Sequence, residues 1–196
     1  MRLVLASSSP RRAELLRAAG FAFETVVANV DERARSGETP SAYVRRLAAE
    51  KSAAVRAALT ADAIVLGADT TVVVDGDTLG KPRDDEDSAA MLRRLSGRRH
   101  EVMTGISVRQ GAHELGSVET TSVWFAALTK EDIAWYVASG EGRDKAGAYA
   151  IQGLASRFIP RIEGSYANVV GLPVAAITEL VRSILASRPE TGYSER

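Results

Sequence analysis

Short apolar runs and segments of helical periodicity follow one another along this chain. Leu3 to Ala6, Phe21 to Val27 and Ala61 to Asp69 are apolar runs of strand length. Pro40 to Leu59 instead repeats apolar residues every three or four positions, as one face of a helix does, and Thr39 is a suitable N-cap. The alternation of the two patterns predicts an α/β domain.

The second half of the chain adds hairpin patterns and further helices. Thr71 to Val74, followed by the turn Asp75-Gly76, predicts a short hairpin. Val102 to Val108 and Val118 to Phe125 flank a Gln-Gly turn and predict a longer antiparallel pair. The glycine-rich stretch 140–171 holds two short strand candidates. We expect the helices at residues 84–95, 129–137 and 173–185.

Length and composition indicate one domain. A chain of 196 residues with 45% apolar content can bury a core of its own. The sequence contains neither an internal repeat nor a low-complexity linker. We therefore expect a single domain in two lobes over residues 1–188, followed by a polar tail at 189–196.

Charge and composition exclude several classes of function. The 25 Lys and Arg residues balance 25 Asp and Glu residues, which argues against bulk attraction to nucleic acid or to an anionic membrane. The absence of cysteine excludes a disulfide scaffold and a cysteine nucleophile. His100 and His113 lack the spacing of metal ligands or of a serine triad. No apolar stretch suits a signal peptide or a membrane span, so we expect a cytoplasmic protein.

The first predicted strand runs directly into a helix start that carries hydroxyl groups and arginines. Ser9 is a good N-cap, Pro10 is a good first helical residue, and Gly20 is a suitable end. The unpaired N–H groups of the first turn, with Arg11 and Arg12 beside them, suit an anion such as phosphate. A capped surface helix with solvated arginines is the alternative, because the glycines of a P-loop are missing.

Acidic residues follow two of the predicted strands. Asp69 ends the run 64–68, where small residues let a ligand approach the backbone and where open α/β sheets bind their ligands. A carboxylate there can hold a divalent metal or take a proton from water, although an ordinary turn aspartate also fits. Asp31 and Glu32 lie just beyond Val27, where an ordinary surface turn explains them without a functional role.

Two lysines have unusual settings. Lys51 shares the apolar stripe of Leu47 and Val55 on the long predicted helix, so it either snorkels along the core edge or serves a site. Lys81 is held between Gly80 and Pro82, a stiff turn that could fix an ammonium group over a cleft or could be a plain loop.

Taken together and in this order, these segments resemble those of Maf proteins, in the Maf and Ham1 superfamily of nucleoside triphosphate pyrophosphatases. Each segment alone is weak evidence of a relationship, but the set spans nearly the whole chain, and the match as a whole is specific. The matching segments are ASSSPRR at 6–12, DE at 31–32, AEK at 49–51, GADT at 67–70, GKP at 80–82, TG at 104–105, DKAGAYAIQG at 144–153 and GSYANVVGLP at 164–173.

The resemblance implies a fold and a set of site residues. The fold would be an elongated, twisted mixed β-sheet flanked by helices, with two lobes around a deep nucleotide groove. Asp69 would be the proton acceptor, and it would bind metal together with Glu32. The triphosphate would be held by Ser7, Arg11, Lys51 and Lys81, while Arg12, Thr70 and Gln152 match the positions that separate dTTP- and UTP-cleaving members from those that prefer 7-methyl-GTP.

The implied reaction is attack of water on the α-phosphorus of dTTP or UTP, with pyrophosphate leaving. Several cations and a hard metal, Mg²⁺ or Mn²⁺, suit a substrate with about four negative charges. Two alternatives remain open: a nucleotide-binding regulator of septum formation and a 7-methyl-GTP pyrophosphatase. The resemblance also implies a homodimer.

Overall fold

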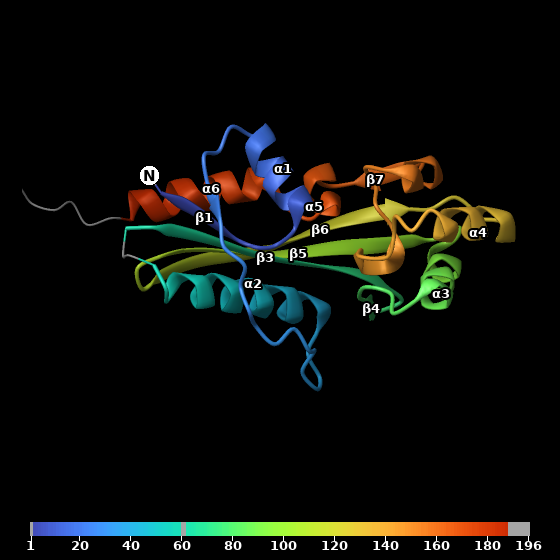
Figure 1. Cartoon of the computed structure of the whole chain (residues 1–196), viewed down its shortest axis with the longest axis horizontal. Helices are drawn as coiled ribbons and strands as arrows, with labels where there is room; N and C mark the ends of the chain where they lie inside the picture. The colour runs from blue at the N-terminus through green and yellow to red at the C-terminus, as the bar shows by residue number, and fades with distance from the viewer. Residues whose placement is uncertain (1, 60–61, 188–196) are drawn as a thin grey trace, which may run out of the picture.

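One mixed β-sheet forms the centre of the molecule in the computed structural model, which describes residues 2–59 and 62–187 (Figure 1). β1 is parallel to β2 and to β3, whereas all other pairs are antiparallel. The expected elongated mixed sheet is thus confirmed. Its strand order is β2 (Glu24–Thr25), β1 (Leu3–Ala6), β3 (Ile64–Val74), β5 (Arg99–Gln110), β6 (His113–Trp124) and β7 (Arg161–Glu163), and β4 (Asp77–Leu79) pairs with β3 outside this path.

Helices cover both faces of the sheet. α2 lies below the sheet in Figure 1 and α1, α5 and α6 lie above it, while α3 and α4 pack together at one end. No helix in the described ranges is both long and apolar enough to cross a membrane. The helices are α1 (Pro10–Ala18), α2 (Pro40–Arg56), α3 (Asp85–Leu95), α4 (Lys130–Ala138), α5 (Tyr166–Val170) and α6 (Val174–Ala186), with 3₁₀ turns η1 (Ala146–Ala148) and η2 (Leu154–Phe158).

Local capping signals placed the helices well. The side chain of Thr39 accepts a hydrogen bond from the backbone of Ala42 at the start of α2, and Thr129 forms a capping box with Asp132 at α4. The first helix differs, because Ser9 makes no capping bond with its side chain. Its backbone N–H instead donates to Oγ of Ser7, at 3.2 Å.

Several strand predictions were wrong in extent or in number, and the long hairpin also covers Arg99–Gln110 and His113–Trp124 in place of 102–108 and 118–125. β2 covers only Glu24–Thr25 instead of 21–27, because within the described residues it pairs only with Val4 and Leu5 of β1. β3 does not end at Asp69 but continues to Val74, since β5 pairs with it from Ile64 to Val73 and β4 pairs with Val74. The stretch 140–171 holds one strand, η1, η2 and α5 in place of two strands. The predicted tail, 189–196, lies outside the described residues, and the domain bounds stay a prediction.

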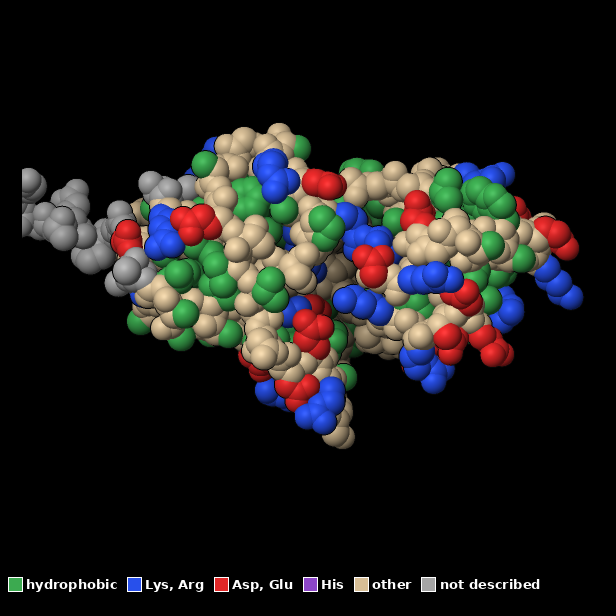
Figure 2. Space-filling model, viewed as in Figure 1, with side chains coloured by type: hydrophobic (Ala, Val, Ile, Leu, Met, Phe, Trp, Pro, Cys, Tyr) green, Lys and Arg blue, Asp and Glu red, His purple; other side chains and the backbone are tan. Residues whose placement is uncertain are grey.

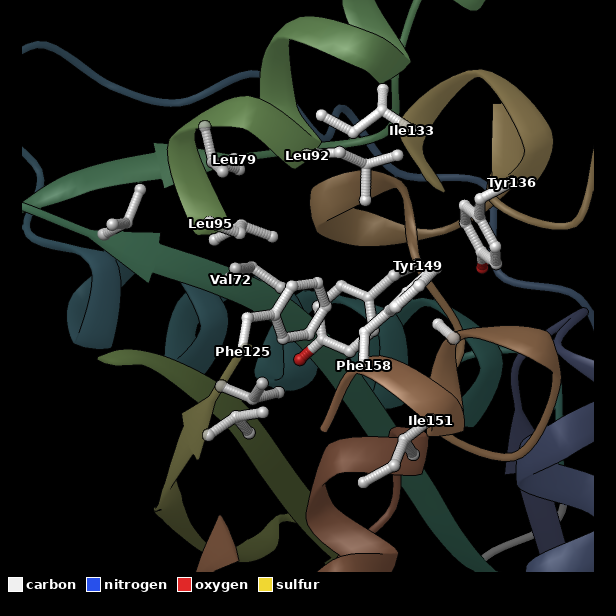
Figure 3. Packing of buried hydrophobic residues seen from close by; sticks show 14 of the residues in the cluster. Val72, Leu79, Leu92, Leu95, Phe125, Ile133, Tyr136, Tyr149, Ile151 and Phe158 are labelled. Atoms are coloured by element: carbon white, nitrogen blue, oxygen red, sulfur yellow. The ribbon is translucent and has the colours of Figure 1, made fainter. Parts of the chain in front are cut away.

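The apolar core is divided between the two ends of β3. At one end, aromatic residues pack with leucines of α3, as Figure 3 shows for Phe125, Tyr149 and Phe158. At the other end, α1 and α6 pack on the first half of β3. The change occurs along β3 itself, where Ala68 belongs to one cluster and Val72 to the other. The polar residues of β3 therefore lie between two separate cores.

Glycines in the sheet let α2 approach unusually closely. A Cβ atom added at Gly67 would lie 2.1 Å from the carbonyl oxygen of Ala48, and one at Gly105 would lie 2.2 Å from that of Val44. Gly67 therefore admits a helix backbone, whereas the sequence indicated the approach of a ligand. The close fit fixes the distance of α2, and hence of Lys51, from the sheet.

Candidate active site

The site forms where one edge of β3 is open. β1 pairs with β3 from Ile64 to Gly67, and β4 pairs with it from Val72 to Val74. On that edge residues 68–71 have no strand partner within the described ranges, although β5 pairs with them on the other edge. The opening lies between the two core clusters, and Asp69, Thr70 and Thr71 line it.

The opening is a cavity of about 450 Å³. Figure 2 shows Lys, Arg and acidic side chains gathered around a hollow between the two ends of the molecule. The fold brings together every residue for which the resemblance implies a role. The cavity is lined by Ser7, Arg11, Arg12, Glu32, Lys51, Asp69, Thr70, Lys81 and Gln152, among others.

Lys51 lies between the two carboxylates with predicted metal-binding roles. Its Nζ atom is 2.7 Å from Oδ1 of Asp69 and 2.6 Å from Oε1 of Glu32. Lys51 and Asp69 are only 7% and 8% exposed, so each needs a partner of opposite charge. The lysine thus meets a carboxylate at the edge of the core and does not snorkel to solvent.

Residues 26–39, the crossing segment, carry Glu32 and have no regular secondary structure; they connect β2 to α2 across the sheet (Figure 1). Arg46 of α2 holds the segment by two hydrogen bonds to Glu38, at 2.6 and 2.7 Å. Tyr43 donates its hydroxyl to the backbone oxygen of Glu32, at 3.0 Å. One helix therefore positions both the lysine and the segment that bears its second carboxylate.

Neighbouring charges set the protonation states in the cavity. Burial tends to raise the pKa of Glu32, but the hydrogen bond and charge of Lys51, with the charge of Lys81, outweigh it and lower the pKa. Burial, with the charges of Asp69 and Glu32, raises the pKa of Tyr43 to about 12. Glu32 is therefore an anion at neutral pH, and the Tyr43 hydroxyl remains a donor.

Arg12 is held by the protein at the open edge of β3. Its Nε donates to the backbone oxygen of Gly171 at 2.9 Å, and its Nη1 to that of Ala68 at 2.8 Å. Nη1 also donates to Oγ of Ser7 at 3.2 Å, and Nη2 to Oγ1 of Thr70 at 3.0 Å. The guanidinium thus satisfies a backbone oxygen at the edge of β3 that is open between β1 and β4. It also fixes the hydroxyl groups of Ser7 and Thr70.

Arg11, Lys81 and Gln152 reach the cavity from α1, the turn after β4 and the turn before η2. Burial lowers the pKa of Arg11, and the negative charge of Asp144 opposes this effect. Gln152 is exposed, so its amide is accessible to a ligand.

The sequence assigns no role to four residues that shape this site: Tyr43, Arg46, Asp144 and Lys145. Asp144 and Lys145 belong to a segment that resembles the family. The resemblance indicates that this segment matters, but it assigns no role to either residue. Tyr43 and Arg46 act on the crossing segment, whose path depends on tertiary structure. No local pattern would have revealed them.

The carboxylates of Glu32 and Asp69 are hard oxygen donors, which suit Mg²⁺ or Mn²⁺. Within the described residues no group of three or more His, Cys, Asp or Glu side chains could hold a metal ion. Two carboxylates that share one lysine therefore fit a metal that also takes oxygens from a bound phosphate, as Mg²⁺ commonly does. They do not form a complete protein cage.

Comparison with known proteins gives consistent matches. A family model described as Maf-like protein matches residues 2–184. The chain is 54% identical over 186 residues to the dTTP/UTP pyrophosphatase of Anaeromyxobacter sp. (strain Fw109-5), covering 92% of this chain and 88% of the relative. It is 50% identical over 186 residues to the dTTP/UTP pyrophosphatase of Escherichia coli O157:H7, covering 95% and 94%.

A solved structure shares the fold. The Staphylococcus aureus Ham1 protein superposes with a TM-score of 0.54 at 17% sequence identity, covering 94% of this chain and 100% of that chain. At this identity the likeness concerns the fold alone.

Proposed function

This chain belongs to the Maf family, and we propose that it is a pyrophosphatase that hydrolyses dTTP and UTP to the nucleoside monophosphate and pyrophosphate. The names of its relatives support the substrates. The observation that carries the proposal is the buried Lys51, paired with Asp69 and Glu32 in a cavity lined by further cations. Such a cavity suits a polyanion and contains a base beside it.

In the proposed reaction the oxygen of a water molecule attacks the α-phosphorus, and the bond from that phosphorus to the bridging oxygen breaks. Asp69 accepts the proton of the water, and the electron pair of the broken bond leaves with pyrophosphate. Oδ1 of Asp69 already accepts a hydrogen bond from Lys51, so Oδ2 is the oxygen available for the proton. Arg11 and Lys81 hold the phosphates and offset the charge that builds up on the leaving group.

Glu32 and Asp69 would hold the divalent cation, which would supply positive charge and lower the pKa of the water. Lys51 keeps the two carboxylates close together before the cation binds. Ser7 and Thr70 are held by Arg12, so we assign Arg12 an indirect part in substrate binding, through the hydroxyl groups that it orients.

Release of pyrophosphate tests the proposed function. With dTTP or UTP and Mg²⁺ we expect monophosphate and pyrophosphate in equal amounts, at protein concentrations far below that of the substrate. Chromatography of the products with separate detection of pyrophosphate and orthophosphate measures this. A regulator that binds the triphosphate and releases it intact, or release of orthophosphate with a diphosphate, would contradict the proposal.

Gln152 is our candidate for base selection. An amide can match the carbonyl and N–H groups of thymine or uracil, while cytosine would leave one polar group unpaired, at a cost of about 1–3 kcal/mol. We expect Gln152→Ala to reduce the preference for UTP over CTP, measured as the ratio of kcat/KM values, by about tenfold. Unchanged ratios would remove Gln152 from base recognition, and a wild-type preference for 7-methyl-GTP would contradict the proposed substrates.

Two further expectations belong to the proposal: a cytoplasmic location and a homodimer. Cell fractionation and analytical ultracentrifugation test them separately from the chemistry.

A further inference from the structure

One ion pair that lines the cavity has no part in the mechanism above. Lys145 and Asp144 both line the cavity, and the Nζ atom of Lys145 pairs with Oδ1 of Asp144. The two partners differ in exposure: the side chain of Lys145 is 15% exposed and that of Asp144 is 67% exposed. The carboxylate can therefore move into solvent, while the ammonium group stays in the cavity wall.

The backbone that carries this pair is tightly fixed. A Cβ atom at Gly142 would lie 2.1 Å from the carbonyl oxygen of Ala148, so only glycine fits there. Gly147 has a φ of 69° and donates its N–H to the carbonyl oxygen of Gly80, at 3.0 Å. That bond ties the loop to the residue before Lys81. The two lysines are thus presented to the cavity by connected turns.

Lys145 differs from Lys51 in how its charge is balanced. Lys51 is bound by two carboxylates, one of which is buried with it and cannot leave. Among the residues that the structure describes, Lys145 has one ion-pair partner, the exposed Asp144, whose charge also acts on Arg11. A triphosphate in the cavity would repel the carboxylate of Asp144 and attract the cations of Lys145 and Arg11.

We propose that Lys145 is a further phosphate-binding residue of this site, and that Asp144 is its counter-ion in the free protein, displaced when a triphosphate binds. The inference rests on the proposed function for the identity of the ligand. It predicts effects of opposite sign for the two partners. Loss of Lys145 removes an attraction, whereas neutralising Asp144 removes a competitor for Lys145 and a repulsion of the phosphates.

The experiment compares Lys145→Gln and Asp144→Asn with a matched pair of controls. Arg143 precedes them and pairs with Asp85 at 2.9 Å, and neither residue is among those that line the cavity. Arg143→Gln and Asp85→Asn therefore make the same charge changes on a neighbouring ion pair. Binding of α,β-methylene-dTTP with Mg²⁺ is measured by calorimetry, and the melting temperature without ligand is recorded.

We expect Lys145→Gln to raise the Kd about tenfold and Asp144→Asn to lower it several-fold, as expected for a charged hydrogen bond gained or lost. Both controls should stay within about twofold of the wild type on the same scale. Lys145→Arg, which keeps the charge, should recover most of the affinity. The proposal is overturned if Lys145→Gln matches Arg143→Gln, or if Asp144→Asn weakens binding.

A second probe separates this inference from the proposed function. Inorganic tripolyphosphate with Mg²⁺ presents the same charges without a nucleoside, and the same order of affinities is expected for the variants. If the wild type hydrolyses no nucleotide but Lys145→Gln weakens tripolyphosphate binding, the proposed function fails and the phosphate site stands. If the wild type releases pyrophosphate and the variants match their controls, only the inference fails.

Discussion

Asp69→Asn is expected to lower kcat for dTTP at least about 100-fold, because it removes the proposed base and one of the two charges proposed to hold the metal. The residue is buried against Lys51, and an asparagine oxygen can still accept the hydrogen bond that Oδ1 accepts now. We therefore expect the variant to fold. Steady-state kinetics at saturating dTTP, with the melting temperature measured in parallel, provide the test.

Glu32→Gln is the matched comparison, because it changes the other carboxylate that pairs with Lys51. Its activity should recover substantially when Mg²⁺ is raised, since its defect is weaker metal binding. Asp69→Asn should not recover, because a higher metal concentration does not replace a base. A folded Asp69→Asn variant that reaches the wild-type kcat at high Mg²⁺ would refute the assignment of Asp69 as the proton acceptor.

The capping and periodicity signals predicted most of the helices because they are local. Thr39 and Pro40 begin α2, and Thr129 caps α4, where the sequence indicates. The end of β3 was misplaced for a non-local reason. Asp69, Thr70 and Thr71 interrupt the apolar run, but β5 pairs with them, and this register holds them in an extended strand. The same polar interruption marks the site, at the open edge.

The predicted site residues came mainly from family resemblance, and each reaches the cavity. Local chemistry alone left Asp69 and Lys51 ambiguous, because an aspartate after an apolar run and a lysine on a core stripe each have ordinary explanations. Their meaning comes from the 2.7 Å contact between them, across 18 positions of sequence. Likewise, Arg12 satisfies the backbone of Ala68 only because the strand partners of β3 leave a gap there.

The close packing of α2 on the sheet leads to the second large expected effect, a loss of stability. Gly105→Ala would place a Cβ atom 2.2 Å from the carbonyl oxygen and 2.3 Å from the carbonyl carbon of Val44. Both atoms belong to the helix backbone, so a side-chain rotation cannot relieve the clash and α2 must move. Overpacking of this kind typically costs about 1–3 kcal/mol, and a rigid helix backbone puts the expected cost at the upper end.

We expect Gly105→Ala to lower the Tm by about 6–12 °C, since about 3 kcal/mol corresponds to that shift in a chain of this size. Gly80→Ala is the control: an added Cβ atom meets nothing within 4 Å there, and its φ is not positive, so the Tm should change little. The shift of α2 should also move Lys51 away from Asp69. We therefore expect a lower kcat even at temperatures well below that of unfolding. An unchanged Tm in Gly105→Ala would mean that α2 can rise from the sheet at little cost. The glycine would then not set the position of Lys51.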